Sequence, residues 1–568
     1  MLKIEAEKTL AKILYFGVPF TTIFIFTGSV SDPVNVTKLL ATSIFGFSAL
    51  ALLVNSGAHS LWRESRLLLI SAFLLLITML SASIASDSSF STNLYGIFGR
   101  NTGLLAYGSF IFLALAASVL RNQNHFEKLV IGLLTAGAIN VVYCLWAWQV
   151  GDFIGWNNPF GTILGTFGNP NFISSFLGIF ISATIGYLII GPRSTIIKIV
   201  SIIFVLVAFL EVLHTYSIQG VVVTGIGIAY NGFLLVRSRF KSLNWLAAYT
   251  FLVVVAGVTA VAGMLQKGPL TGYLYKTSVS LRGEYWQAGI NMGIDHPFTG
   301  IGMDGYGNFY RQARDAGAII LPGVSVVTNA AHNVIADFFA YGGYPLLIAY
   351  LFFLSLGAQS IIRVIRRERA FNPAFAALSV SWICYQSQSI ISINQIGLAI
   401  WGWVLTGALV GYEFSSRPLG VSNKSESKFS AGLNGKAKQS VISSTLVAGI
   451  GMVVGLLIAL PPYNADVTWR TATNSQKLEN VENALTPSYM NPSDSSRLAQ
   501  AVNLLEQSKL YDLSYKYAKY AVEFNPNYFD AWKLLYFISK STEEDKAEAL
   551  SNLKRLDPLN PDVLATPK

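Results

Sequence analysis

The chain has 568 residues and a formal charge of +10 at pH 7, with 52% hydrophobic and 12% charged residues. This balance is far from that of a soluble globular protein and predicts an all-α fold whose helices cross a lipid bilayer. The basic residues form short clusters between apolar runs and no continuous basic face, so we expect no nucleic-acid partner.

Apolar runs of about twenty residues recur from residue 10 to residue 460, and each can cross about 30 Å of hydrocarbon as a helix. The first run has no small-residue cleavage site, so we interpret it as a retained helix and not as a signal peptide. The sequence predicts a polytopic bundle of about thirteen spans, at residues 10–28, 37–54, 67–85, 103–120, 129–150, 170–190, 195–214, 220–236, 244–265, 333–358, 373–391, 396–412 and 440–460.

Lysine and arginine gather in alternate loops, as in the four arginines of residues 363–369. The positive-inside rule then predicts a multi-pass protein of the cytoplasmic (inner) membrane with a cytoplasmic N-terminus and an extracytoplasmic C-terminus. The predicted domains are a transmembrane domain with a long external loop, a Ser-, Gly- and Lys-rich cytoplasmic linker, a last transmembrane helix and an extracytoplasmic helical domain, at residues 1–414 (loop 266–331), 415–439, 440–460 and 461–568.

The C-terminal segment carries a repeated dipeptide. Asn491-Pro492, Asn525-Pro526 and Asp557-Pro558 recur at spacings of 34 and 32 residues, and each follows a pair of helical stretches. This period resembles that of tetratricopeptide repeats, and Ala518, Ala521 and Trp532 lie where two helices could pack closely. A generic helical hairpin cap is the alternative. Stacked helix pairs present a concave surface, which suggests an envelope protein or a long glycan as a partner.

Polar residues at the predicted external face are the candidates for chemistry. Arg100 stands at the entrance of a span, where it can serve a ligand or simply extend its side chain to the membrane interface. Asn169 and Asn171 belong to the sequence GNPN, which is typical of a helix start. The free backbone N–H groups of such a start also suit a phosphate or diphosphate, and both interpretations can hold together.

The long external loop contains LRGEYWQAGINMGIDHPFTGIG, whose first part is predicted to be a helix that ends before Pro297. Arg282 on this helix can hold a diphosphate with two hydrogen bonds, or can form a surface ion pair with Glu284.

Asp295 and Asp304 lie nine residues apart in a loop and show no metal-ligand pattern. The two cysteines, Cys144 and Cys384, lie in apolar runs, so we predict neither a metal site nor a disulfide.

His332 is the last loop residue before a predicted span. A neutral imidazole can accept a proton from a sugar hydroxyl near neutral pH, which suits a general base. A single histidine at an interface can equally be structural. His214 and His296 are rivals on the same face, whereas His59 and His125 fall on the predicted cytoplasmic side.

Seven short motifs appear in a fixed order between about residue 90 and residue 412: GRNTGLL, TFGNPNF, SIQG, R-x-x-x-W at Arg282 and Trp286, HPFTGIG with Phe309, AHN, and YGGYP. This set resembles the O-antigen ligase and O-antigen polymerase family, whose members often carry C-terminal tetratricopeptide repeats. The resemblance implies a metal-independent glycosyltransferase of the GT-C kind that needs no cofactor. Such enzymes move a glycan from an undecaprenyl diphosphate carrier to an acceptor hydroxyl on a glycan, glycolipid or protein, outside the cytoplasmic membrane.

Carried over by position, the resemblance implies that Arg282 binds the donor diphosphate and that His332 activates or orients the acceptor hydroxyl. Many ligases have a Ser-Arg-Gly motif where this chain has Ser217-Ile218-Gln219-Gly220, so a second diphosphate arginine is missing. Either Arg100 replaces it or Gln219 hydrogen-bonds the donor, and Asn169 and Asn171 complete the predicted diphosphate site.

Two other functions compete with this prediction. A polysaccharide or lipid transporter or flippase would fit the number of spans, although the sequence has no recognisable inverted repeats and few charges within its spans. A non-catalytic envelope scaffold would recruit partners through the external repeats and would tolerate changes at Arg282 and His332. Ligase, polymerase and protein O-glycosyltransferase share the donor chemistry, so the sequence does not separate them.

Overall fold

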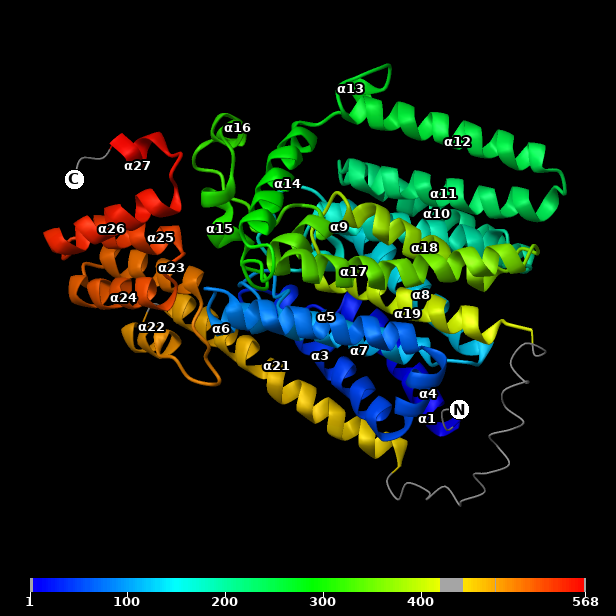
Figure 1. The fold of residues 1–568 in the computed structure, drawn as a ribbon, viewed down its shortest axis with the longest axis horizontal. Helices are drawn as coiled ribbons and strands as arrows, with labels where there is room; N and C mark the ends of the chain where they lie inside the picture. The colour runs from blue at the N-terminus through cyan, green and yellow to red at the C-terminus, as the bar shows by residue number, and fades with distance from the viewer. Residues whose placement is uncertain (1–3, 419–442, 476, 566–568) are drawn as a thin grey trace.

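The computed structural model describes residues 4–418, 443–475 and 477–565. Within these ranges every regular element is a helix, apart from one isolated β-bridge between Ser488 and Asn491. Figure 1 shows a bundle of long helices with a smaller group of short helices at one end, formed by the C-terminal segment. The predicted all-α fold class is confirmed.

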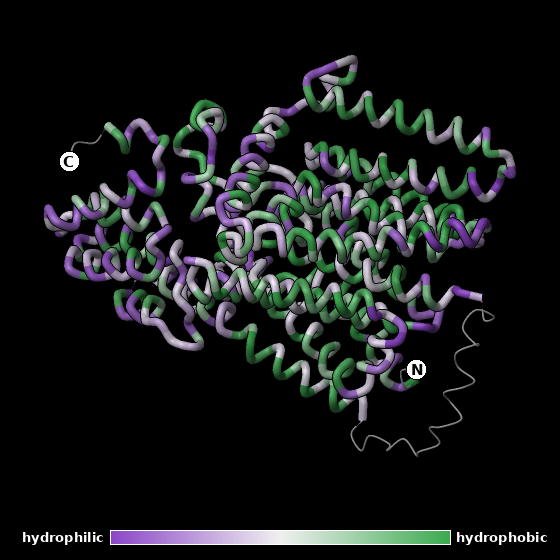
Figure 2. The backbone as a smooth tube through the Cα atoms, in the orientation of Figure 1, coloured by the Kyte–Doolittle hydropathy of each residue, from purple (hydrophilic) through white to green (hydrophobic). Residues whose placement is uncertain are grey.

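Ten helices in the described ranges are long and apolar enough to cross a membrane. Figure 2 shows hydrophobic residues along most of their length, and more hydrophilic residues in the C-terminal group. The ten are the continuous segment Asn35–Glu64 formed by α3 (Asn35–Leu52) and α4 (Ala58–Glu64), α5 (Arg66–Ala85), α8 (Gln123–Gln149), α9 (Pro170–Thr184) extended to Ile189, α10 (Thr195–His214), α11 (Ile218–Arg239), α12 (Leu243–Met264), α17 (Val334–Arg367), α19 (Ile396–Ser415) and α21 (Ser444–Ser475).

The other three predicted spans are not among these ten. The first coincides with a continuous helical stretch formed by α1 (Ile4–Lys12), a π-helical turn (Ile13–Gly17) and α2 (Val18–Ile23), and the other two with the shorter helices α7 (Leu104–Ser118) and α18 (Pro373–Ser389). The helices α7 and α18 have 15 and 17 residues. At 1.5 Å per residue they are about 22 and 25 Å long, less than the thickness of the hydrocarbon layer. Both are almost entirely buried among other helices. A membrane protein tolerates such short helices where the connecting backbone is buried or lines a cavity.

The last span, α21, packs closely against α3 through small residues. The Ser48 hydroxyl donates to the Ala448 carbonyl at 2.9 Å. A Cβ atom at Gly455 would lie only 2.3 Å from the Ser43 carbonyl oxygen, so the two backbones approach too closely for any side chain there. Small residues at this spacing are a common means of helix association in membranes. Residues 419–439 of the predicted linker lie outside the described residues.

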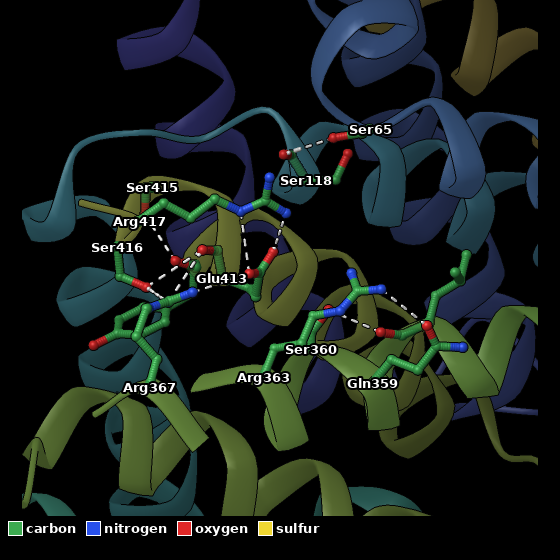
Figure 3. A network of polar contacts seen from close by, with 12 residues as sticks. Ser65, Ser118, Gln359, Ser360, Arg363, Arg367, Glu413, Ser415, Ser416 and Arg417 are labelled. Carbon is green, nitrogen blue, oxygen red and sulfur yellow. Dashed lines mark hydrogen bonds and ion pairs between the residues drawn. The ribbon is translucent and has the colours of Figure 1, made fainter. Parts of the chain in front are cut away.

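The two ends of the bundle differ. The N-terminus lies at one end, and the external-loop helices and the C-terminal helices lie at the other (Figure 1). At the N-terminal end Glu413 accepts hydrogen bonds from Arg417 at 2.6 Å and from Arg367 at 3.1 Å, and Figure 3 shows this network. The long loop and the C-terminus therefore share one end of the bundle, as the predicted topology requires.

The long loop folds into α13 (Thr271–Leu274), α14 (Thr277–Asp295), α15 (Tyr306–Ala313) and α16 (Ala316–Ala318). The predicted helix around Arg282 is confirmed as α14. The loop after it pairs with a break in α17, where Gly343 has φ +61°. The break frees the carbonyl oxygens of Ala340 and Tyr341, which accept hydrogen bonds from the N–H groups of Ile301 and Gly302 at 2.9 and 3.1 Å.

The C-terminal group has its own apolar core, which contains the predicted packing residues Ala518, Ala521 and Trp532. It consists of α22 (Leu478–Leu485), α23 (Ser495–Gln507), α24 (Tyr511–Phe524), α25 (Phe529–Phe537), α26 (Glu543–Leu556) and α27 (Pro561–Ala565). The helices α23 with α24 and α25 with α26 follow each other as hairpins. The assignment to tetratricopeptide repeats stays a prediction.

Candidate active site

One pocket of about 250 Å³ collects residues from seven separate segments of the chain. It lies where the N-terminal parts of α3, α9, α11 and α14 meet the loops before α7 and α17 and the loop between α18 and α19. Its lining includes all six residues predicted from the sequence, which are Arg100, Asn169, Asn171, Gln219, Arg282 and His332. The structure thus places them together, while their roles remain predictions.

Arg282 reaches the pocket from the first half of α14 and is half-buried. Within the described part of the chain its guanidinium forms no hydrogen bond or ion pair, and the alternative pairing with Glu284 is not formed. Burial lowers the pKa of Arg282, but a guanidinium remains charged in proteins. The pocket therefore contains a positive charge whose donors are free for an anionic ligand.

His332 is held by its backbone. Its φ of +56° is uncommon for a residue with a side chain, and such conformations persist only where neighbouring contacts enforce them. The Asp337 carboxylate accepts from the Ala331 N–H at 2.7 Å, and the Trp286 indole N–H donates to the His332 carbonyl at 3.4 Å. Trp286 lies one turn after Arg282 on α14, so this hydrogen bond fixes His332 relative to the helix that carries the arginine.

The His332 imidazole is neutral at pH 7. Burial lowers its pKa from 6.5 to about 4, and the positive charges of Arg282 and Arg100 act in the same direction. Its ring nitrogens have no hydrogen-bond partner among the residues that the structure describes. A neutral imidazole has one nitrogen lone pair available to accept a proton.

This electrostatic environment predicts a pH profile. If glycan transfer requires neutral His332, kcat/KM for the donor should hold as the pH falls below 6.5 and decline only near pH 4, because kcat/KM reports the free enzyme. The acid limb of the kcat profile should lie at higher pH than that of kcat/KM. A bound diphosphate offsets the charges of the Arg100 and Arg282 guanidinium groups and so raises the pKa of His332 in the complex. Rates in proteoliposomes between pH 4 and 8 measure both limbs. Coincident limbs near pH 6.5 would contradict this environment.

Arg100 is nine-tenths buried, so the alternative of an interfacial side chain that extends into solvent does not hold. It donates to the Asn329 carbonyl, lies 3.4 Å from Asp304 Oδ1 and 3.5 Å from the Tyr341 hydroxyl. Burial alone would lower the pKa of Arg100, but the acidic side chains around it, Asp304 first among them, together outweigh burial and raise the pKa. Arg100 therefore supplies positive charge to the pocket and also supports the loop that leads to His332.

The amide side chains play different structural parts. Asn169 caps α9 by accepting from the Asn171 N–H at 2.9 Å, which confirms the predicted helix start. The Asn171 side-chain oxygen accepts from the Ser217 hydroxyl at 2.8 Å. Gln219 donates to Gln388 at 3.0 Å, and its own side-chain oxygen is buried without a partner in the described part of the chain.

Sequence reasoning missed one wall of the pocket, which comes from Asn35 and from residues 392–395, Ser-Ile-Asn-Gln. Asn394 donates to the Tyr107 hydroxyl at 3.0 Å and accepts from the Tyr385 hydroxyl at 2.7 Å. The signal was the presence of three polar residues between two apolar spans. This polar segment is short and looks like an ordinary helix cap, so it did not indicate a pocket. Gln395 does cap the start of α19.

The structure also separates the rival histidines. The His214 ring stacks on Trp148 at 4.3 Å, and the His296 ring lies 6.2 Å from that of Phe309. Neither lines the pocket. Among the candidate histidines, His332 is the one that shares a cavity with Arg282.

The comparison with protein families agrees with this geometry. Residues 202–351 match the family model described as O-antigen ligase, a segment that contains Gln219, Arg282 and His332. No curated protein matches the chain. The whole long loop of residues 266–331 lies inside the matched segment, together with Arg282 and His332. The chain is therefore a helical protein with ten candidate membrane spans and an O-antigen ligase domain at residues 202–351.

Proposed function

We propose that this protein transfers a glycan from an undecaprenyl diphosphate carrier to an acceptor hydroxyl at the outer face of the cytoplasmic membrane, without a metal ion. The O-antigen ligase domain supports glycan transfer of the ligase or polymerase type in general. The observation that carries the finer proposal is the pocket in which Arg282, with free donors, lies beside neutral His332.

The electrostatics of the pocket favour an anionic ligand. Arg282 brings a positive charge that is unpaired within the described ranges, and Arg100 brings a second one that is paired behind the lining with Asp304. The other polar lining residues are neutral amides, a serine and His332, and no aspartate or glutamate belongs to the lining in the described residues. A diphosphate leaving group gains negative charge as its bond to the sugar breaks. Preorganised guanidinium groups in a partly dry cavity stabilise such a charge far better than water does.

The reaction needs one proton transfer. The acceptor hydroxyl oxygen attacks the anomeric carbon of the donor sugar, and its proton passes to the free ring nitrogen of His332. The bond between the anomeric carbon and the phosphate oxygen breaks, and undecaprenyl diphosphate leaves with the electron pair, held by Arg282. Binding and proton acceptance thus fall to two different side chains of one cavity.

The outer location rests on the charge pattern of the loops. Basic residues gather at the end of the bundle where Glu413 pairs with Arg367 and Arg417, and the pocket lies with the external loop. The positive-inside rule puts the basic end in the cytoplasm. The lipid carrier would then approach the pocket from the outer leaflet.

Analysis of glycans in a strain that lacks the gene tests this proposal. Single repeat units on a surface acceptor would indicate a lost polymerase, and long lipid-linked chains without an acceptor would indicate a lost ligase. Purified protein in nanodiscs should then convert the accumulated lipid-linked glycan to free undecaprenyl diphosphate in the presence of the acceptor. Lipid-linked glycan that accumulates on the cytoplasmic face would contradict transfer and favour a flippase.

A further inference from the structure

We propose that the C-terminal helical domain braces the long loop beside the candidate pocket, with Asp557 as a positioning residue that holds this loop in place. Asp557 follows α26 and is fully buried. Its carboxylate accepts two hydrogen bonds from Arg314 at 2.8 and 3.0 Å and one from Arg311 at 2.9 Å. Both arginines belong to the external loop, at and just after α15.

The contact between Asp557 and the two arginines is buried and has several further contacts around it, unlike an exposed surface ion pair. The Arg314 side chain is fully buried, and the Arg311 guanidinium lies 4.2 Å from the centre of the Phe529 ring of α25. Gln312 donates to the Arg555 carbonyl at 3.1 Å. A carboxylate that is buried between two guanidinium groups cannot lose them without leaving uncompensated charges inside the protein. The domain must therefore stay docked for these charges to be satisfied.

Two contacts connect the docked segment to the pocket. The Asn291 side chain of α14 donates to the Ala313 carbonyl at 2.8 Å, at the end of α15. The Tyr306 hydroxyl at the other end of α15 donates to the Tyr285 carbonyl. Both partners lie on α14, the helix that carries Arg282, and the Tyr285 ring lies 5.5 Å from that of His332. Any shift of α15 therefore displaces the helix that presents the arginine.

A second docking contact acts independently on the other side of the pocket. The Arg497 guanidinium of α23 lies 4.9 Å from the Phe98 ring, and the Ser91 hydroxyl donates to the Ser493 carbonyl at 2.9 Å. Asp466 of α21 bonds Arg497 at 3.3 Å and accepts from the Ser31 N–H at 2.6 Å. The C-terminal domain thus holds the segment that leads to Arg100 as well as the one that leads to Arg282.

Hydrogen exchange of the full-length protein in nanodiscs tests the docking itself. Asp557→Asn should increase exchange in residues 306–313 and in α14, because the local opening of this segment becomes easier. Asp557→Glu, which keeps the charge, should restore part of the protection. The matched control is Asp545→Asn, because Asp545 pairs with Lys519 inside the C-terminal domain and forms no hydrogen bond or ion pair with α15 among the described residues. Unchanged protection of α14 and α15 in Asp557→Asn would overturn the proposal.

Kinetics test the consequence for the site, and this step rests on the proposed function. Asp557→Asn should raise the KM for the lipid-linked donor and lower kcat/KM by up to about 100-fold, because small displacements of positioned groups cost that much. The KM for the acceptor should not change. A change in the acceptor KM alone would overturn positioning and indicate that the domain recruits the acceptor. If Asp557→Asn does not fold, Arg311→Ala removes one of the two guanidinium groups and is measured in its place.

The two proposals can fail separately. If the wild-type protein transfers no glycan, the proposed function is wrong, while hydrogen exchange still decides whether Asp557 holds the loop. If transfer is normal and exchange is unchanged in Asp557→Asn, the docking proposal is wrong and the proposed function stands.

Discussion

Arg282→Ala should lower glycan transfer by about 100- to 1,000-fold, the loss that follows removal of one preorganised donor to a developing negative charge. The side chain lines the pocket and forms no hydrogen bond or ion pair with the described part of the chain. Its removal should therefore cost little stability, so the melting temperature in detergent should stay near that of the wild type. Transfer rates and donor affinity in nanodiscs measure the effect.

Arg282→Lys makes this prediction more specific. A lysine keeps the charge but cannot offer two parallel N–H groups to a diphosphate, so we expect an activity between those of the wild type and Arg282→Ala. Arg470→Ala is the matched control, because Arg470 is also a half-buried arginine but does not line the pocket. Normal transfer by Arg282→Ala would remove the diphosphate role.

His332→Asn should lower transfer by about 100- to 10,000-fold, the usual contribution of a positioned general base. Asparagine is the better test than alanine, because His332 has a positive φ and asparagine adopts that conformation more readily. The backbone contact with Trp286 can then persist while the proton acceptor is lost. Single-turnover rates with a saturating lipid-linked donor measure the chemical step.

Donor binding separates loss of a base from loss of the pocket. In His332→Asn, binding of undecaprenyl diphosphate should remain within a few-fold of the wild type, because Arg282 and Arg100 are unchanged. His214→Asn and His296→Asn are matched controls from outside the pocket and should leave transfer intact. Retained transfer in His332→Asn, or loss of transfer in His296→Asn, would contradict the role of His332.

The candidate residues could be predicted because each bears a local signal. Arg282 and His332 are polar groups at the external side of a chain that is mostly apolar, and GNPN marks a helix start whatever the tertiary fold is. The segment Ser-Ile-Asn-Gln at residues 392–395 carried a weaker signal of the same kind. These residues contribute to the pocket because α18 ends at Ser389 and α19 begins at Ile396, so that the loop between the two helices lines the cavity.

The contacts behind the pocket could not be predicted in this way. The sequence shows Asp304 only as a loop aspartate outside any metal-ligand pattern, whereas in the structure it pairs with Arg100 and accepts a hydrogen bond from Thr102 at 3.1 Å. The break of α17 at Gly343 determines which carbonyl groups meet the loop after α14. Asp557 was noted as part of a repeat, but its partners Arg311 and Arg314 lie more than two hundred residues earlier in the chain.

The sequence by itself determined the membrane class, most of the helices and the candidate residues that share the pocket, because hydrophobic length, charge asymmetry and helix caps act within a few residues of one another. Only the tertiary structure decided that Arg100, Arg282 and His332 share one cavity and that the C-terminal domain docks on the loop beside it. Such contacts join segments that are distant in sequence. They depend on how whole helices pack, and no local pattern records that packing.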